Sequence, residues 1–159
     1  MKKLLSLFAL LAIFAGCSDN DEPTKNEDLK PTFIGTLEVT PQPGSPFSEF
    51  SEQDIEFNYE VDAEKLTLVM PKIKFVAEMP RWIAFEVREL NYQRGDSQLT
   101  FSIDETIPYW NGAPYDPNND GKYKITNLVG RHDISSGKLY VEFDCYSMHV
   151  NYVGDYILK

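Results

Sequence analysis

Hydrophobic and polar residues alternate along most of this chain with a period of two. Residues 55–62 show the pattern most clearly, because every odd position is apolar and every even position is Glu, Asn or Asp. Successive side chains of a β-strand point to opposite faces, so this alternation predicts a strand with one buried face. The same alternation predicts further strands at residues 33–40, 66–75, 82–89, 98–103, 122–128, 138–146 and 148–157.

Short turn-forming segments separate these predicted strands. Arg94-Gly95-Asp96, Asn118-Asn119-Asp120-Gly121 and Ser135-Ser136-Gly137 contain residues that favour tight turns. Pro71 interrupts the run 66–75 and predicts an edge, a bulge or a bend there. We therefore predict an all-β fold, an antiparallel meander closed into an eight- or nine-stranded barrel, with a two-sheet sandwich as the alternative.

The apolar positions of the predicted strands indicate what fills the barrel. They include six phenylalanines and several aliphatic residues: Phe33, Phe57, Phe75, Phe85, Phe101 and Phe143, with Leu37, Leu68, Ile103, Ile125 and Val141. A barrel of eight strands is wide enough either to be filled by side chains or to hold one small ligand. The many rings favour filling. No charged residue shares these positions, so an enclosed ligand would be small, neutral and apolar.

The N-terminal segment predicts export. Lys2 and Lys3 precede an apolar run at residues 4–14, which is too short to span a bilayer and ends at Ala15-Gly16 before Cys17. The segment resembles the lipobox of bacterial lipoproteins, which implies a signal peptide at residues 1–16 and a lipid on Cys17. An acidic run follows this cysteine, as it does in lipoproteins that Gram-negative gut commensals export to the cell surface. The resemblance implies an outer membrane lipoprotein exposed at the surface.

Residues 17–32 are polar and acidic, too poor in apolar side chains to order themselves, and we interpret them as a flexible tether to a barrel domain at residues 33–159. The chain has a formal net charge of −10, which becomes −12 when the signal removes Lys2 and Lys3. This charge repels phosphate backbones, so we expect no nucleic acid partner. The expected link to the membrane is the lipid on Cys17.

Residues 104–121 form the one long segment without a strand pattern. Segments of this length tend to be functional or disordered, and this one contains Tyr109, Trp110 and Tyr115, whose rings stack on sugars or on protein partners. The same rings would equally serve to close one end of the barrel. We take these three residues as the candidate binding residues for a glycan or protein partner.

The chain offers little for catalysis. Asp116, Asn118 and Asp120 have the spacing of the first half of a calcium loop, but Asn127 stands where the bidentate Glu would be, so calcium is a weak alternative and we predict no metal. Cys145 shares the apolar phase and is expected to be buried. His132 and His149 are expected to be solvated, as is the pair Glu142 and Asp144. We therefore predict neither an enzyme nor a cofactor.

Several phrases of the chain are similar to the calycin-like β-barrel domains of lipoproteins from gut commensals. They are residues 33–37 (FIGTL), 66–75 (LTLVMPKIKF), 79–80 (MP), 123–130 (YKITNLVG) and 150–154 (VNYVG). The resemblance implies a lipocalin-like barrel over nearly all of residues 33–157. We expect a non-catalytic binding or interaction module that acts through residues 104–121 and the barrel rim. The alternative is a lipocalin-like carrier of a small apolar ligand.

Overall fold

The computed structural model describes residues 30–62 and 64–158. Cys17 and the signal segment lie outside the described residues. Ten strands make up the described part: β1 Thr32–Pro41, β2 Phe50–Val61, β3 Leu66–Ile73, β4 Ile83–Arg94, β5 Gln98–Thr106, β6 Tyr109–Trp110, β7 Ala113–Pro114, β8 Ile125–Asp133, β9 Lys138–Cys145 and β10 Met148–Ile157.

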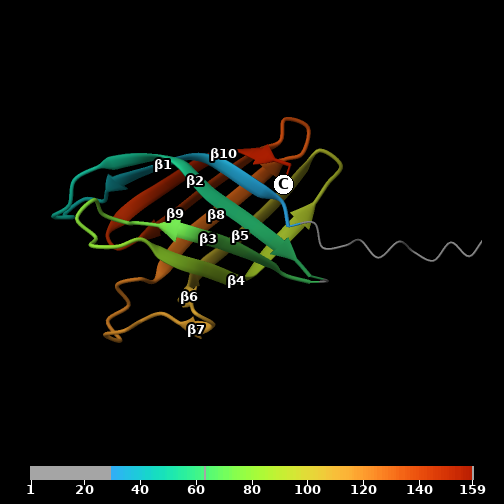
Figure 1. Ribbon diagram of the computed structural model, residues 1–159. Helices are drawn as coiled ribbons and strands as arrows, with labels where there is room; N and C mark the ends of the chain where they lie inside the picture. The colour runs from blue at the N-terminus through green and yellow to red at the C-terminus, as the bar shows by residue number, and fades with distance from the viewer. Residues whose placement is uncertain (1–29, 63, 159) are drawn as a thin grey trace, which may run out of the picture.

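Eight of these strands close into an antiparallel barrel (Figure 1). The order around the barrel is β1, β2, β3, β4, β5, β8, β9 and β10, and β10 pairs with β1 over the full length of both strands. The remaining two strands form a small hairpin, β6–β7, which is attached to β4 through the pairing of Glu86 with Tyr109. The prediction of an all-β meander barrel is confirmed, with eight strands in the closed sheet.

Aromatic and aliphatic side chains fill the interior of the barrel. The six phenylalanines predicted to lie there are each 3% exposed or less. The ring of Tyr152 stacks on that of Phe57 with 3.9 Å between centroids, and its hydroxyl donates a hydrogen bond to the backbone oxygen of Ile55. Ile103, which was predicted to face inward, is only partly buried. Side chains thus occupy the space along the barrel axis.

Several strand boundaries differ from the sequence pattern. The strand predicted at 122–128 is β8 and lies at 125–133, because residues 115–124 continue the long connection from β7. Strand β4 extends to Arg94, well beyond the predicted 82–89, and β2 begins at Phe50 instead of residue 55. Pro71 stays within β3, where the pairing with β4 shifts register between Met70 and Ile73. The proline therefore coincides with a bulge or irregularity, one of the alternatives predicted for it.

The two ends of the barrel differ in what covers them. Strand β1 begins and β10 ends at one end, which we call the N-terminal end; the short turns 62–65, 95–97 and 134–137 lie there too. The opposite end, which we call the loop end, carries the connections 42–49, 74–82, 107–124 and 146–147. Figure 1 shows the loop end on the left and the N-terminal end on the right. The longer connections are thus gathered on one end.

Candidate functional site

The segment 107–124 crosses the loop end and is more ordered than its sequence indicated. Asn111 and Gly112 both have positive φ, 50° and 80°, and they form the turn of the β6–β7 hairpin. An Asn-Gly pair is the strongest short sequence signal for a two-residue hairpin. The β6–β7 hairpin was therefore predictable from the sequence, although we did not predict it. After the hairpin, the backbone N–H of Tyr115 donates to the oxygen of Pro108 at 2.8 Å. This hydrogen bond turns the chain back toward the barrel.

Five partly buried aromatic rings form a continuous row across the loop end. We call them the aromatic row: Trp110, Tyr115, Tyr123, Tyr146 and Phe47. Neighbouring centroids along this sequence are 5.1, 4.8, 5.3 and 5.4 Å apart. These separations and the tilted or edge-on angles fall in the favourable range for aromatic pairs. Segments that are far apart in the chain therefore present one joined surface of rings.

The aromatic row rests on the core of the barrel. Tyr115 lies 5.3 Å from the ring of Phe85, and Tyr123 lies 6.0 Å from Phe85 and 6.5 Å from Phe75. Phe75 in turn contacts Phe143 edge-on. The row thus closes the loop end of the barrel, and each of its rings is partly buried there. Closing the barrel and presenting a binding surface are compatible roles for the same residues.

Of the three candidate binding residues, two belong to the aromatic row and one does not. Trp110 and Tyr115 are neighbours in the row. Tyr109 lies instead beside β4, where the Arg88 guanidinium is 4.2 Å from its ring centroid and is held by Glu86. Tyr109 and Trp110 are adjacent in a strand, so their side chains point to opposite faces. Tyr109 is therefore separate from the site.

Tyr146 reaches the row through a strained turn. Tyr146 and Ser147 connect β9 to β10, and their φ angles of 58° and 59° are both in the left-handed region. That conformation costs a residue with a side chain about 1–2 kcal/mol and persists where surrounding contacts impose it. Here Tyr123 and Phe47 flank the ring of Tyr146. The turn therefore holds Tyr146 in place within the row.

Cations lie over two rings of the aromatic row. The Arg81 guanidinium is 5.6 Å from the ring centroid of Trp110, and the Lys122 ammonium is 4.1 Å from that of Tyr146. Burial, followed by the nearby Tyr115 and Tyr146, raises the pKa of Tyr123 to about 12. That phenol is therefore neutral at physiological pH.

A hollow of about 260 Å³ adjoins the Tyr146 end of the row. It is open to solvent, and its lining includes Phe47, Lys122, Asp144 and Tyr146. Burial alone would raise the pKa of Asp144, but hydrogen bonds from Asn127 and His149 outweigh it and hold the pKa below its usual value. Asp144 is thus an ionised carboxylate that is hydrogen-bonded to Asn127 and His149. A second, polar hollow of about 420 Å³ lies on the outer face of β4, β5 and β8.

Two of the weak calcium candidates, Asp116 and Asp120, accept hydrogen bonds from the backbone of their own turn. The Asp116 carboxylate accepts hydrogen bonds from the N–H groups of Asp120 and Gly121, and Asp120 accepts from the N–H of Lys122. Within residues 30–62 and 64–158, no three side chains of His, Cys, Asp or Glu are grouped as metal ligands would be. These carboxylates therefore act as turn caps.

Cys145 and the two histidines have defined structural surroundings. Cys145 is buried, and burial raises the pKa of its thiol well above the usual value. His132 was expected to be solvated, and this was wrong, because it is half-buried with Nδ1 2.7 Å from the Tyr59 hydroxyl and its ring edge-on to Phe33. His149 likewise has Nδ1 2.9 Å from Asp144. All three side chains are engaged by neighbours.

Comparison with known proteins gave no match to any family model, curated protein or solved structure. In the part of the chain that the structure describes, no helix is both long enough and apolar enough to cross a membrane. We therefore infer function from the fold and from the aromatic row.

Proposed function

We propose that this chain is a lipid-anchored lipoprotein of the outer membrane, exposed at the cell surface and related to the calycin-like barrel lipoproteins. In this proposal the barrel is a non-catalytic module that binds carbohydrate through the aromatic row. The observation that carries it is the continuous row of five partly buried rings at the loop end. Aromatic faces suit the C–H faces of sugar rings, and tyrosine hydroxyls suit their polar rims.

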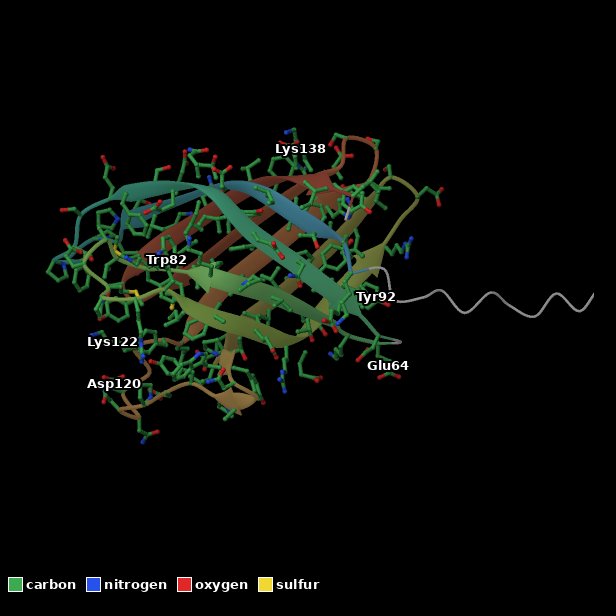
Figure 2. All side chains as sticks on the ribbon, viewed as in Figure 1. Glu64, Trp82, Tyr92, Asp120, Lys122 and Lys138 are labelled. Carbon is green, nitrogen blue, oxygen red and sulfur yellow. The ribbon has the colours of Figure 1, made fainter. Side chains whose placement is uncertain are left out.

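The position of the row supports a tethered binding module. The described chain begins at the N-terminal end of the barrel, and the aromatic row lies at the opposite end. A lipid on Cys17 and its tether would therefore join the barrel at the end opposite the row and leave the row uncovered by the attachment. Figure 2 displays this separation, because Lys122 beside the row and Glu64 in an N-terminal-end turn lie at opposite sides of the molecule.

The packed interior favours surface binding over transport of an enclosed ligand. The rings of Phe57 and Tyr152 stack in the barrel, and Phe75, Phe85 and Phe143 are in contact toward the loop end. The two hollows described above are both open to solvent and lie at the loop end and on the outer face. A ligand pocket usually encloses most of its ligand within apolar walls.

Binding is tested with the mature lipoprotein in detergent on an array of glycans. We expect carbohydrate binding that the double variant Tyr115→Leu/Tyr123→Leu loses, because both central stacking faces are removed. Tyr140→Leu is the matched control, since Tyr140 is a half-buried tyrosine on β9, outside the row. Binding that survives loss of both central rings would contradict the proposal. A bound fatty-acid probe unaffected by the double variant would instead favour the enclosed-ligand alternative.

Anchoring and exposure are tested separately. We expect radioactive palmitate to label the wild-type chain and not Cys17→Ser, and we expect protease added to intact cells to remove the barrel domain. A periplasmic marker protein that remains intact in the same cells is the control. Labelling of the Cys17→Ser variant, or a barrel protected until the outer membrane is opened, would contradict this part of the proposal.

A further inference from the structure

The two cations over the aromatic row have no acidic partner among the described residues. Arg81 lies over Trp110 and Lys122 lies over Tyr146, and neither forms an ion pair with a carboxylate within residues 30–62 and 64–158. Four other described cations are paired, namely Lys30 with Glu60, Arg88 with Glu86, Lys124 with Glu105 and Lys138 with Asp155. Five more form no ion pair within the described ranges: Lys65, Lys72, Lys74, Arg94 and Arg131. Arg81 and Lys122 differ from these five because they lie over rings of the row.

A second group of unpaired cations lies on the outer surface beside Arg81. The ammonium groups of Lys72 and Lys74 are 4.6 and 5.0 Å from the ring centroid of Trp82, which follows Arg81 in the chain. Within the described ranges, neither lysine forms an ion pair. Figure 2 labels Trp82 and Lys122, which both lie toward the loop end. Cations and aromatic rings therefore occur together on this part of the surface.

Three carboxylates at the loop end are hydrogen-bonded to partners other than these cations. Asp116 caps its own turn, and Asp144 is hydrogen-bonded to Asn127 and His149. Asp120 accepts from the backbone N–H of Lys122 and does not pair with its ammonium group. None of these carboxylates forms an ion pair with Arg81 or Lys122, and charges held beside an apolar surface gain from an anionic partner.

We propose that the ligand of the aromatic row is an acidic carbohydrate, one that carries carboxylate or sulfate groups. This inference rests on the proposed function and specifies its ligand class. The sugar rings stack on Tyr115 and Tyr123, and the acidic groups bind Arg81 and Lys122. Arginine presents a planar set of donors that matches a carboxylate or a sulfate. Lys72 and Lys74 extend the positive surface past Arg81.

The exposed apolar residues favour carbohydrate over a protein partner at this site. The large hydrophobic side chains with the greatest exposure are Val129, Ile134, Tyr156 and Leu158. They belong to β8, the 134–137 turn and the end of β10, so none of them borders the row. Protein interfaces are also enriched in aromatic residues and arginine, but their fully buried centres contain further apolar area, which the row lacks beyond its own rings. The net charge of −10 also disfavours nucleic acid.

The experiment uses the mature lipoprotein in detergent and a panel of paired glycans. Each acidic glycan, whether it carries a uronate, sulfate or sialate group, is paired with its methyl-esterified, desulfated or desialylated counterpart, and dissociation constants are measured at low and high salt. We expect the acidic member of at least one pair to bind more tightly and to lose affinity as salt rises. We expect Arg81→Gln/Lys122→Gln to weaken that binding by about two- to fivefold for each charge removed.

Arg131→Gln is the matched control, because Arg131 lies 4.6 Å over the ring of Tyr140 and has no ion-pair partner within the described ranges. It should bind as the wild type does. Neutral glycans that bind through the row, with no preference for any acidic counterpart, would overturn this inference and leave the proposed function standing. No carbohydrate binding by the wild type would overturn both. Polyglutamate binding as tightly as the acidic glycans would overturn the choice of carbohydrate. Thermal denaturation confirms that each variant is folded.

Discussion

The rings of Tyr115 and Tyr123 lie 4.8 Å apart at an interplanar angle of 56°, and this contact joins the segment after β7 to the chain that enters β8. Tyr115 also lies on Phe85 of β4. One side chain therefore connects the hairpin, the core and the proposed binding surface. Its removal is expected to loosen the segment without unfolding the barrel, whose eight strands pair independently of it.

Tyr115→Leu tests this connection. We expect a loss of about 1 kcal/mol in the free energy of unfolding, since aromatic pairs contribute about 0.5–1.5 kcal/mol beyond area burial. We also expect faster hydrogen exchange at the amide of residue 115, which bonds to Pro108, and unchanged exchange in β1 and β10. Tyr109→Leu is the control, because Tyr109 contacts Arg88 outside the row. Unchanged exchange at residue 115 would show that the hairpin alone holds the segment.

Gly130 provides space for a core ring. It pairs with Phe101 across β5 and β8, and a β-carbon at residue 130 would lie 2.1 Å from the Phe101 ring. We expect Gly130→Ala to lower the free energy of unfolding by about 1–3 kcal/mol, because the ring has to move within a packed interior. In Gly95→Ala, the nearest atom to the new β-carbon is 3.7 Å away. Chemical denaturation should therefore separate the two variants, and equal stability would contradict the packing argument.

The barrel was predictable because its signal is local and repeated. Residues 55–62 alternate strictly, and β2 contains all of them except Asp62, with Ile55, Phe57 and Tyr59 buried. The absence of a long helical pattern and the short turns then favoured a meander. Closure between β1 and β10 does not follow from any local pattern, but a sheet with unpaired edges was the less favourable choice.

The aromatic row was only partly predictable, because it depends on contacts between distant segments. Trp110 and Tyr115 were visible as aromatic residues of a long loop. Phe47 and Tyr146 join the row from the β1–β2 connection and the β9–β10 turn, which meet only when the barrel closes. Tyr146 was assigned to the end of a predicted strand, because non-glycine residues seldom form a turn with two positive φ angles.

The Tyr152 hydroxyl is a polar group inside the barrel, and its contribution to stability can be measured. Its hydroxyl is buried and donates to the Ile55 oxygen at 3.0 Å, and burial raises its pKa above the usual value. We expect Tyr152→Phe to cost about 1–3 kcal/mol of unfolding free energy, because the Ile55 oxygen loses its side-chain donor while the ring stacking on Phe57 remains. Tyr140→Phe, at a half-buried position, should change stability little. A stable Tyr152→Phe variant would indicate that the Ile55 oxygen finds another donor.

His132 is expected to make stability depend on pH. Burial lowers the pKa of His132 below 6.5, with Arg94 acting in the same direction and Asp133 opposing. The unfolded chain then binds the proton more readily than the folded chain, so stability is lost as the pH falls from neutral through about 6.5 toward the folded-state pKa. His132→Gln keeps a hydrogen-bonding group near Tyr59 but cannot be protonated. Its free energy of unfolding, measured by urea denaturation between pH 7 and pH 5, should therefore decline less than that of the wild type. Parallel declines in the two proteins would mean that His132 has the same pKa in the folded and unfolded chains.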